Sequence, residues 1–242
     1  MLTFDTAPAE LDILDEELKL GRFVYPHKIP FVSGTSSERA QQRQRVFGHL
    51  QRTGRMSRNR LRDDVEDLLR LWSRPEVLVT QVSTEMATGS KILERGGWSG
   101  EQGVLSRQTG ESVTFHGLRA AQVVPAVFDV LPDVPPVRIA PVSYVARGAG
   151  GRDLFGGSEP PREKRVADRY FTAPPIRAGV VSCSVRGADA GRMTWFDTPD
   201  GRFFTTVDHL PDGAQRHTFT PAGKARIGQW VRDRINQRLS GY

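Results

Sequence analysis

The spacing of apolar residues along the 242-residue chain predicts an alternation of amphipathic helices and short strands. The strongest helical pattern lies in residues 58–73, where Leu61, Val65, Leu68 and Trp72 share one face. Helices are predicted at residues 8–20, 37–53, 58–73, 119–131 and 163–171, and in a final segment that ends near Leu239. Gly21, Gly54 and Pro75 are the expected stop residues for the first three.

Alternating apolar and polar positions predict two groups of short strands joined by tight turns. The first group is EVLVTQVSTEM, SKILERGGWSG, EQGVLSRQTG and GESVTFHGL, and the second is IRAGVVSCSV, GRMTWFDT, GRFFTTVDHL and QRHTFTP. A proline-flanked strand is expected between them at residues 137–145. Each group is a β-meander that leads into a helix.

The two meander-plus-helix segments share a constant offset. Phe115 and Phe219 end comparable strands 104 residues apart, and the same offset relates the apolar positions of the helices that follow. These positions are Val123, Val127 and Leu131 in the first helix and Ile227, Val231 and Ile235 in the second. The pattern indicates either an internal duplication with pseudo-twofold symmetry or a chance similarity between β-rich segments.

Residues 147–165 are rich in Gly, Pro and charged side chains and are predicted to be a linker. We expect one domain over residues 1–242, with pseudo-halves at about 1–132 and 133–242. The predicted fold class is α+β, with a central, mostly antiparallel sheet flanked by helical bundles.

Composition narrows the class of protein. No stretch approaches the roughly 20 apolar residues of a membrane helix, and the acidic amino terminus lacks the pattern of a signal peptide. The sequence therefore predicts a cytoplasmic protein. The single cysteine, Cys183, excludes an intramolecular disulfide and is expected to be a small buried hydrophobe.

The net charge of +6 raises the question of nucleic-acid binding. The arginines are interpreted as scattered among Asp and Glu rather than gathered in one tract, although the predicted second helix is rich in arginine. A basic nucleic-acid-associated regulatory protein that uses this helix remains the alternative hypothesis.

Catalytic and metal-binding patterns are weak. The five histidines show no ligand spacing, and neither a nucleophile elbow nor a phosphate-binding loop is found. Asp208, His209 and Asp212 at a predicted sheet edge are the only candidates for an enzyme site. We expect no catalytic residue, no cofactor and no metal.

Taken in order, several short motifs resemble the EspG family, the secretion-associated proteins of actinobacterial type VII (ESX) export. They are Leu20-Gly21, Tyr25-Pro26 with Ile29-Pro30, Arg74-Pro75-Glu76, Gly201-Arg202-Phe203-Phe204 and the tail from Thr218 to Leu239. The resemblance covers nearly the whole chain, although each motif alone is weakly specific.

The resemblance implies a non-enzymatic cytoplasmic chaperone. Such a protein binds the apolar helical tip of a PPE-like client, itself paired with a PE protein, and keeps it from self-association before export. When free, the chaperone is expected to be a monomer or a weak homodimer, with no nucleic acid and no membrane insertion.

The resemblance also implies two contact regions. One is the predicted hairpin end RGGWSGEQG, with Gly96, Gly97, Trp98 and Ser99 as candidates, and Trp98 either contacts the client or folds back onto its own helices. The other is the last helix, where Gln229, Arg232, Asp233 and Asn236 are candidate rim residues. Trp230 is expected in the core.

Overall fold

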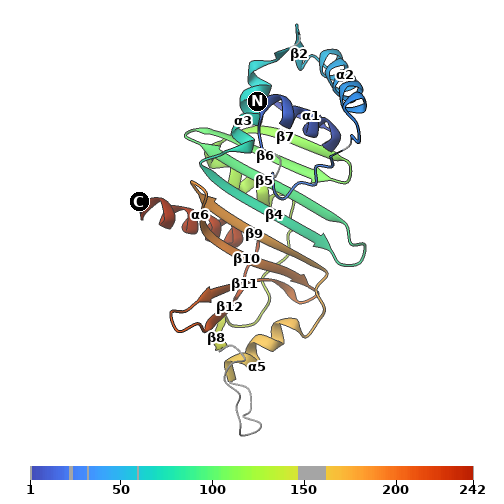
Figure 1. Cartoon of the computed structure of the whole chain (residues 1–242). Coiled ribbons are helices and arrows are strands. Elements are labelled where there is room, and N and C mark those ends of the chain that lie inside the picture. Colours follow the sequence, from blue (N-terminus) through green and yellow to red (C-terminus); the bar gives the residue numbers. More distant parts are fainter. Residues whose placement is uncertain (1, 22–23, 32, 59, 147–161, 242) are drawn as a thin grey trace. The chain divides into compact units, whose positions relative to one another are not determined.

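The computed structural model describes residues 2–21, 24–31, 33–58, 60–146 and 162–241. Over these ranges the chain forms six α-helices, a ten-stranded antiparallel sheet and a separate two-stranded sheet (Figure 1). The predicted α+β class is confirmed. The chain divides into two compact units: Met1–Gln81 with Ile92–Val127 and Ser184–Ala188, and Val82–Lys91 with Phe128–Cys183 and Asp189–Tyr242.

The first unit combines an antiparallel set of strands with helices from the amino-terminal part of the chain. Its strands follow the order β1-β7-β6-β5-β4. The elements are β1 (Thr3–Thr6), α1 (Pro8–Leu18), α2 (Ser36–Arg52), β2 (Met56–Ser57), β3 (Arg60–Leu61), α3 (Asp63–Ser73), β4 (Val77–Glu85), β5 (Lys91–Ser99), β6 (Gln102–Thr109), β7 (Ser112–Arg119) and α4 (Ala120–Phe128).

The second unit has a comparable make-up, with the strand order β9-β10-β11-β12-β8. Its elements are β8 (Val142–Ala146), α5 (Arg162–Asp168), the 3₁₀ helix η1 (Arg169–Phe171), β9 (Arg177–Val185), β10 (Ala188–Thr198), β11 (Gly201–His209), β12 (Gln215–Pro221) and α6 (Lys224–Ser240). The edge strand β8 pairs antiparallel with β12, just as β1 pairs with β7 in the first unit.

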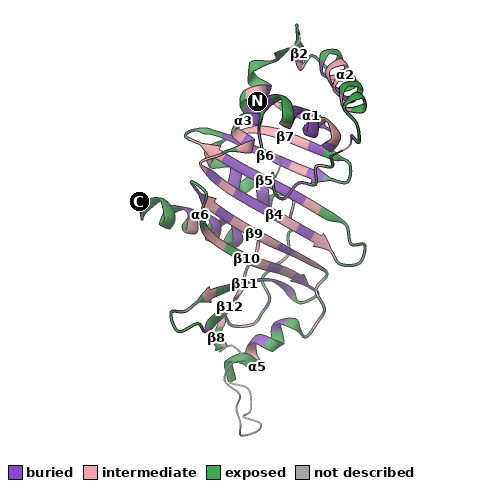
Figure 2. Cartoon of the chain, viewed as in Figure 1, coloured by how far each residue is buried: buried purple, intermediate pink, exposed green. Residues whose placement is uncertain are grey.

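Aromatic rings hold the core of the first unit, where α1 and α3 lie on strands β6 and β7 (Figure 2). Phe4 of β1 stacks on Phe115 of β7 with ring centroids 5.0 Å apart, and Trp72 of α3 meets Phe115 edge-on at 5.1 Å. All three side chains are buried. Offset-stacked and edge-to-face pairs of this kind add to the hydrophobic stabilisation of burial.

The second unit has its own aromatic core. Tyr170 of η1 packs edge-on against Phe203 of β11 at 4.9 Å and lies 5.4 Å from Phe219 of β12. On β9, a Cβ atom at Gly179 would come within 2.5 Å of the ring of Trp195, so only glycine lets this buried ring lie on the strand.

Helix boundaries mostly agree with the sequence pattern. α2 begins after Thr35, whose hydroxyl accepts from the Glu38 backbone N–H at 3.2 Å in a capping box. α1 ends at Leu18 instead of residue 20, because Lys19 already adopts the left-handed conformation (φ 53°) that was expected at Gly21.

The predicted helix at 58–73 is wrong in its first part. Met56–Ser57 and Arg60–Leu61 pair as the antiparallel strands β2 and β3, Arg58 takes a left-handed conformation (φ 49°), and α3 starts only at Asp63. Met56 and Leu61 are both buried and are partners across the two strands, so Leu61 belongs to a strand and not to the first turn of the helix.

Two strand predictions also need correction. The strand expected at 137–145 is shorter and later, at Val142–Ala146. The hairpin turn after β5 falls at Gly100 (φ 55°) and Glu101, so residues 95–99 lie inside a strand and not at a hairpin tip. Most of the predicted linker, residues 147–161, lies outside the described residues, whereas 162–165 begin α5.

Candidate functional site

A hollow of about 650 Å³ lies on the second unit, beside α6 and strands β10 and β11. Trp230 of α6 forms part of its wall and packs against Phe204 with centroids 6.2 Å apart. The guanidinium of Arg234 lies 5.2 Å from the Trp230 ring centroid. The hollow thus offers an indole face next to a cation.

Gly191 of β10 helps to keep this hollow open. A Cβ atom there would lie 3.1 Å from the Trp230 ring, and the residue has φ 154°, which disfavours any side chain. Trp230, which was expected in the core, is half-buried and lines the hollow. The contact between Gly191 and Trp230 could not be predicted from the sequence, because the two residues lie on different elements.

The candidate residues of α6 lie on its outer side. Ile227, Val231 and Ile235 are buried, whereas Gln229, Asp233 and Asn236 are exposed and Arg232 is half-buried. The Gln229 side-chain amide donates to Asp233 at 2.6 Å and accepts from Arg232 at 2.9 Å. The structure therefore brings three of the four predicted residues into one hydrogen-bonded row, and Asn236 follows one turn later.

The candidate residues of β5 differ in exposure. Gly96 and Gly97 are buried: a Cβ on Gly96 would lie 2.7 Å from Val123 of α4, and one on Gly97 would lie 2.6 Å from Pro75. These glycines allow close packing inside the first unit.

Trp98 and Ser99 are half-buried at the end of the same strand, and Ser99 Oγ accepts from the Glu76 backbone N–H at 2.9 Å. Trp98 pairs in register with Gly103 of β6. Because side chains alternate along a strand, Trp98 shares the face on which Gly96 packs under α4. Gly103 also lines a second hollow of about 540 Å³ beside α3, among Leu68, Leu71 and Leu118.

Two of the three candidate enzyme residues, Asp208 and His209, line the hollow of about 650 Å³, but the three are not hydrogen-bonded to one another. His209 is exposed, Asp208 faces Arg234 at 3.9 Å, and Asp212 Oδ1 accepts from the Ala214 backbone N–H at 3.1 Å within its own turn. In the part of the chain that the structure describes, no group of three or more His, Cys, Asp or Glu residues could hold a metal ion. Cys183 is buried, and burial raises the pKa of its thiol to about 12, which makes it a poor nucleophile at neutral pH.

The Gly201-Arg202-Phe203-Phe204 motif has a structural role. Arg202 is fully buried and donates to Asp197 at 2.5 and 3.0 Å and to the Pro132 carbonyl at 3.0 Å. Gly201 (φ 131°) lets the strand pass the backbone of Pro135 and Pro136, where a Cβ atom would come within 3 Å.

None of the helices within the described ranges combines the length and apolar character that a membrane crossing requires. The fold and surfaces define a class of protein: an α+β scaffold with hollows of mixed polarity on its described surface.

Comparison with known proteins identifies the family. The model of the EspG family matches residues 7–233, so the chain belongs to the EspG family of type VII secretion chaperones, which are not enzymes. Among solved structures, the chain is similar to the Mycobacterium tuberculosis type VII secretion system chaperone EspG5, determined in complex with a PE25–PPE41 dimer. The TM-score is 0.66 at 12% identity, over 97% of this chain and 96% of that chain. No curated protein matches this chain.

Proposed function

We propose that this protein binds a PPE-like client, paired with a PE protein, and shields its apolar helical tip before type VII export. The observation that carries the proposal is the family match over residues 7–233, together with the likeness to EspG5 in its complex with PE25–PPE41. An exposed apolar helix tip is prone to self-association, and covering it keeps a client available for export. We place this activity in the cytoplasm, with the free chaperone a monomer or a weak homodimer.

The second unit supplies the first proposed contact region. Gln229, Arg232, Asp233 and Asn236 form a polar row on α6, and the hollow of the same unit presents the Trp230 ring among mostly polar residues. Interfaces commonly combine a polar rim with buried aromatic anchors, and we assign these two roles to the polar row and to Trp230.

The end of β5 supplies the second proposed contact region. Trp98 and Ser99 carry this part of the proposal because they are half-buried, whereas Gly96 and Gly97 contribute by holding α4 and Pro75 close to the strand.

We further propose that the two units derive from one duplicated module. Each has a four-stranded meander followed by a helix and an added edge strand, β1 or β8. The sequence offset of 104 residues carries the first residue of α4, Ala120, onto the first residue of α6, Lys224. Val123 and Val127 correspond to Ile227 and Val231, and all four are buried.

Co-expression with a PE/PPE pair tests the function. The pair is expected to become soluble and to co-elute with the chaperone at a fixed ratio. Trp98→Ala should weaken the complex by about 1–3 kcal/mol, measured by calorimetry on the purified components. Phe31→Ala, which removes an exposed aromatic ring from another part of the first unit, is the matched control and should leave the affinity unchanged.

A client that stays soluble alone and never co-elutes would contradict the function. An unchanged affinity for Trp98→Ala would contradict only the assignment of that residue.

A further inference from the structure

The positive charge of this protein is concentrated in one segment. Residues 36–62, from the start of α2 to just beyond β3, contain eight arginines and one glutamate. The remaining residues contain 26 Lys and Arg against 27 Asp and Glu, so this segment alone accounts for the net charge of +6. The expectation that the arginines are scattered evenly among acidic residues is therefore wrong.

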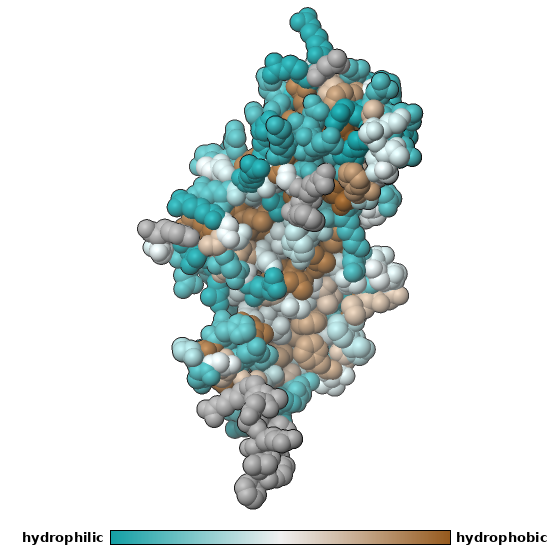
Figure 3. Space-filling view, in the orientation of Figure 1, coloured by the Kyte–Doolittle hydropathy of each residue, from teal (hydrophilic) through white to brown (hydrophobic). Residues whose placement is uncertain are grey.

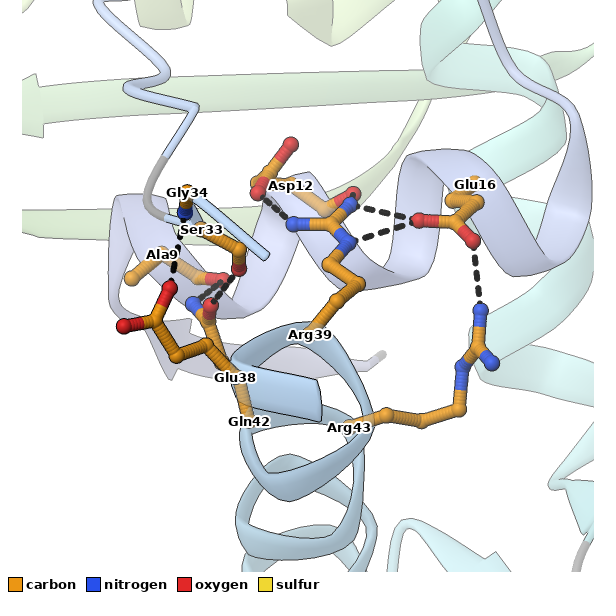
Figure 4. Close-up of polar contacts among 9 residues, drawn as sticks. All are labelled: Ala9, Asp12, Glu16, Ser33, Gly34, Glu38, Arg39, Gln42 and Arg43. Carbon is orange, nitrogen blue, oxygen red and sulfur yellow. Dashed lines mark hydrogen bonds and ion pairs between the residues drawn. The ribbon is translucent and has the colours of Figure 1, made fainter. Parts of the chain in front are cut away.

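One face of α2 already uses arginine to bind carboxylates. Arg39 forms an ion pair with Asp12 and another, at 2.7 Å, with Glu16 of α1, and Arg43 lies 2.5 Å from Glu16 (Figure 4). The hydrogen bond from Arg39 is the main cause that lowers the pKa of Glu16. This face of α2 thus holds an acidic helix of the same chain by guanidinium–carboxylate pairs.

The opposite face of α2 has arginines without such partners. Arg45 and Arg52 are exposed and seven residues apart, which places them on one side of the helix about 10 Å from each other. They lie roughly half a turn around the helix from Arg39 and Arg43. No carboxylate among the described residues lies within ion-pair distance of either.

The β2–β3 hairpin extends this basic surface. Its turn carries the exposed side chains of Arg58 and Arg60, and backbone hydrogen bonds from Arg55 to Leu50 (2.8 Å) and from Arg62 to Arg55 (2.9 Å) tie the hairpin to the end of α2. Arg58 and Arg60 likewise have no ion pair within the described part of the chain. We call Arg45, Arg52, Arg58 and Arg60 the arginine patch.

The surroundings of the arginine patch indicate the chemistry of its partner. Gln41 and Gln44 flank Arg45, and the surface over α2 and β2 is mostly hydrophilic (Figure 3). None of the large exposed hydrophobic side chains of the described residues falls between positions 36 and 62. The patch therefore lacks the aromatic platform that single-stranded nucleic acids need and the apolar face that inserts into a lipid surface.

We propose that the arginine patch binds an acidic segment of a partner protein. Guanidinium groups are suited to pairing with carboxylates, and the other side of α2 already pairs Arg39 and Arg43 with Glu16 of the acidic helix α1. The occupant has carboxylates repeated along one side, at the spacing of Arg45 and Arg52. This interaction lies outside the client-binding role, because it uses neither Trp98 nor α6.

The probe is a fluorescent peptide of about 15 residues with Glu on one helical face, and a second peptide with Gln in place of Glu. Fluorescence anisotropy at low salt is expected to show binding of the Glu peptide alone, weakening as salt is raised. The substitutions Arg45→Gln, Arg52→Gln, Arg58→Gln and Arg60→Gln, made together, should reduce the affinity by about tenfold or more.

The matched control removes the same charge elsewhere: Arg138→Gln, Arg162→Gln, Arg169→Gln and Arg216→Gln, all at exposed positions of the second unit. It should keep the peptide affinity within about twofold, and both quadruple variants should still co-elute with the client. Equal losses in the two variants, or no binding of the Glu peptide, would overturn the proposal. Tighter binding to duplex DNA or to vesicles with anionic lipid than to the peptide would also overturn it, because the partner would then be a phosphate surface.

Discussion

Each unit of this protein buries an arginine, but the two are neutralised in different ways. In the second unit, Arg202 is paired with the buried carboxylate of Asp197, to which Arg177 also donates at 3.0 Å. In the first unit, Arg95 donates to three backbone carbonyls, those of Trp72, Tyr25 and Ser73, at 2.9–3.1 Å.

The neighbours of Arg95 are neutral groups. Ser106 Oγ lies 2.6 Å from His27 Nε2 and accepts from Trp72 Nε1 at 2.7 Å, and its hydroxyl donates to the Arg95 carbonyl at 3.2 Å. Burial lowers the pKa of Arg95 to about 10. The first unit thus holds a buried cation with neutral hydrogen-bond acceptors and the ring of Trp72, whereas the second holds one with an opposite charge. We therefore expect protonation of a buried group near Arg95 to destabilise the first unit, and removal of the Asp197 carboxylate to destabilise the second.

Removing the carboxylate tests the second arrangement and should have the largest effect. Asp197→Ala leaves the buried guanidinium of Arg202 without its counter-charge, and we expect a loss of about 3–5 kcal/mol in the free energy of unfolding, measured by urea denaturation. The exposed Asp129→Ala is the control and should change stability by less than about 0.5 kcal/mol. Similar stabilities for the two variants would mean that Arg177 and Arg202 do not depend on Asp197.

Removing the shared hydroxyl tests the neutral arrangement. Ser106→Ala leaves the buried Trp72 N–H and His27 Nε2 without their partner, and we expect a loss of about 2 kcal/mol in the free energy of unfolding. The exposed Ser112→Ala serves as the matched control on the neighbouring strand. A loss no larger than that of the control would show that the hydroxyl contributes little to the cluster.

The class of fold could be predicted from the sequence because the spacing of apolar residues indicates which side of each helix or strand is buried. α3 from Asp63 onward and α6 followed from apolar spacing, whereas α2 has few apolar positions. Leu239, which was expected near the end of the last helix, lies in the last turn of α6 and is 39% exposed.

The candidate site was predicted less completely, for a physical reason. The rim residues of α6 could be proposed because they share one helix, whereas the hollow beside Trp230 depends on a glycine of β10 and the buried clusters join residues far apart in the chain. His27 and Ser106 are separated by 79 positions. Neither hydrophobic periodicity nor a local motif carries information on such pairs.

The smallest expected effect is the pH dependence of stability that comes from protonation of His27 in the first unit. His27 is buried, stacks on Trp72 at 5.9 Å and has no hydrogen-bond partner for Nδ1 among the described residues. Burial, helped by repulsion from Arg95, lowers its pKa from 6.5 to about 3. Between these two values the unfolded chain binds a proton that the folded chain does not, so stability should fall as the pH falls below about 6.5.

The expected slope rises from about half of 1.4 kcal/mol per pH unit at pH 6.5 to nearly the full value at pH 5, and this window lies above the pH at which most carboxylates titrate. Urea denaturation across this window should show the full slope in the unaltered protein and in His209→Gln, whose histidine is exposed. His27→Gln should keep only the smaller part that comes from His116, whose pKa is also lowered by burial. The readout is the slope and not the absolute stability, so it remains valid even when His27→Gln is less stable at pH 7. If His27→Gln keeps the full slope, the proton is taken up by another group. The neutral surroundings of the buried Arg95 would then no longer explain the acid sensitivity of this protein.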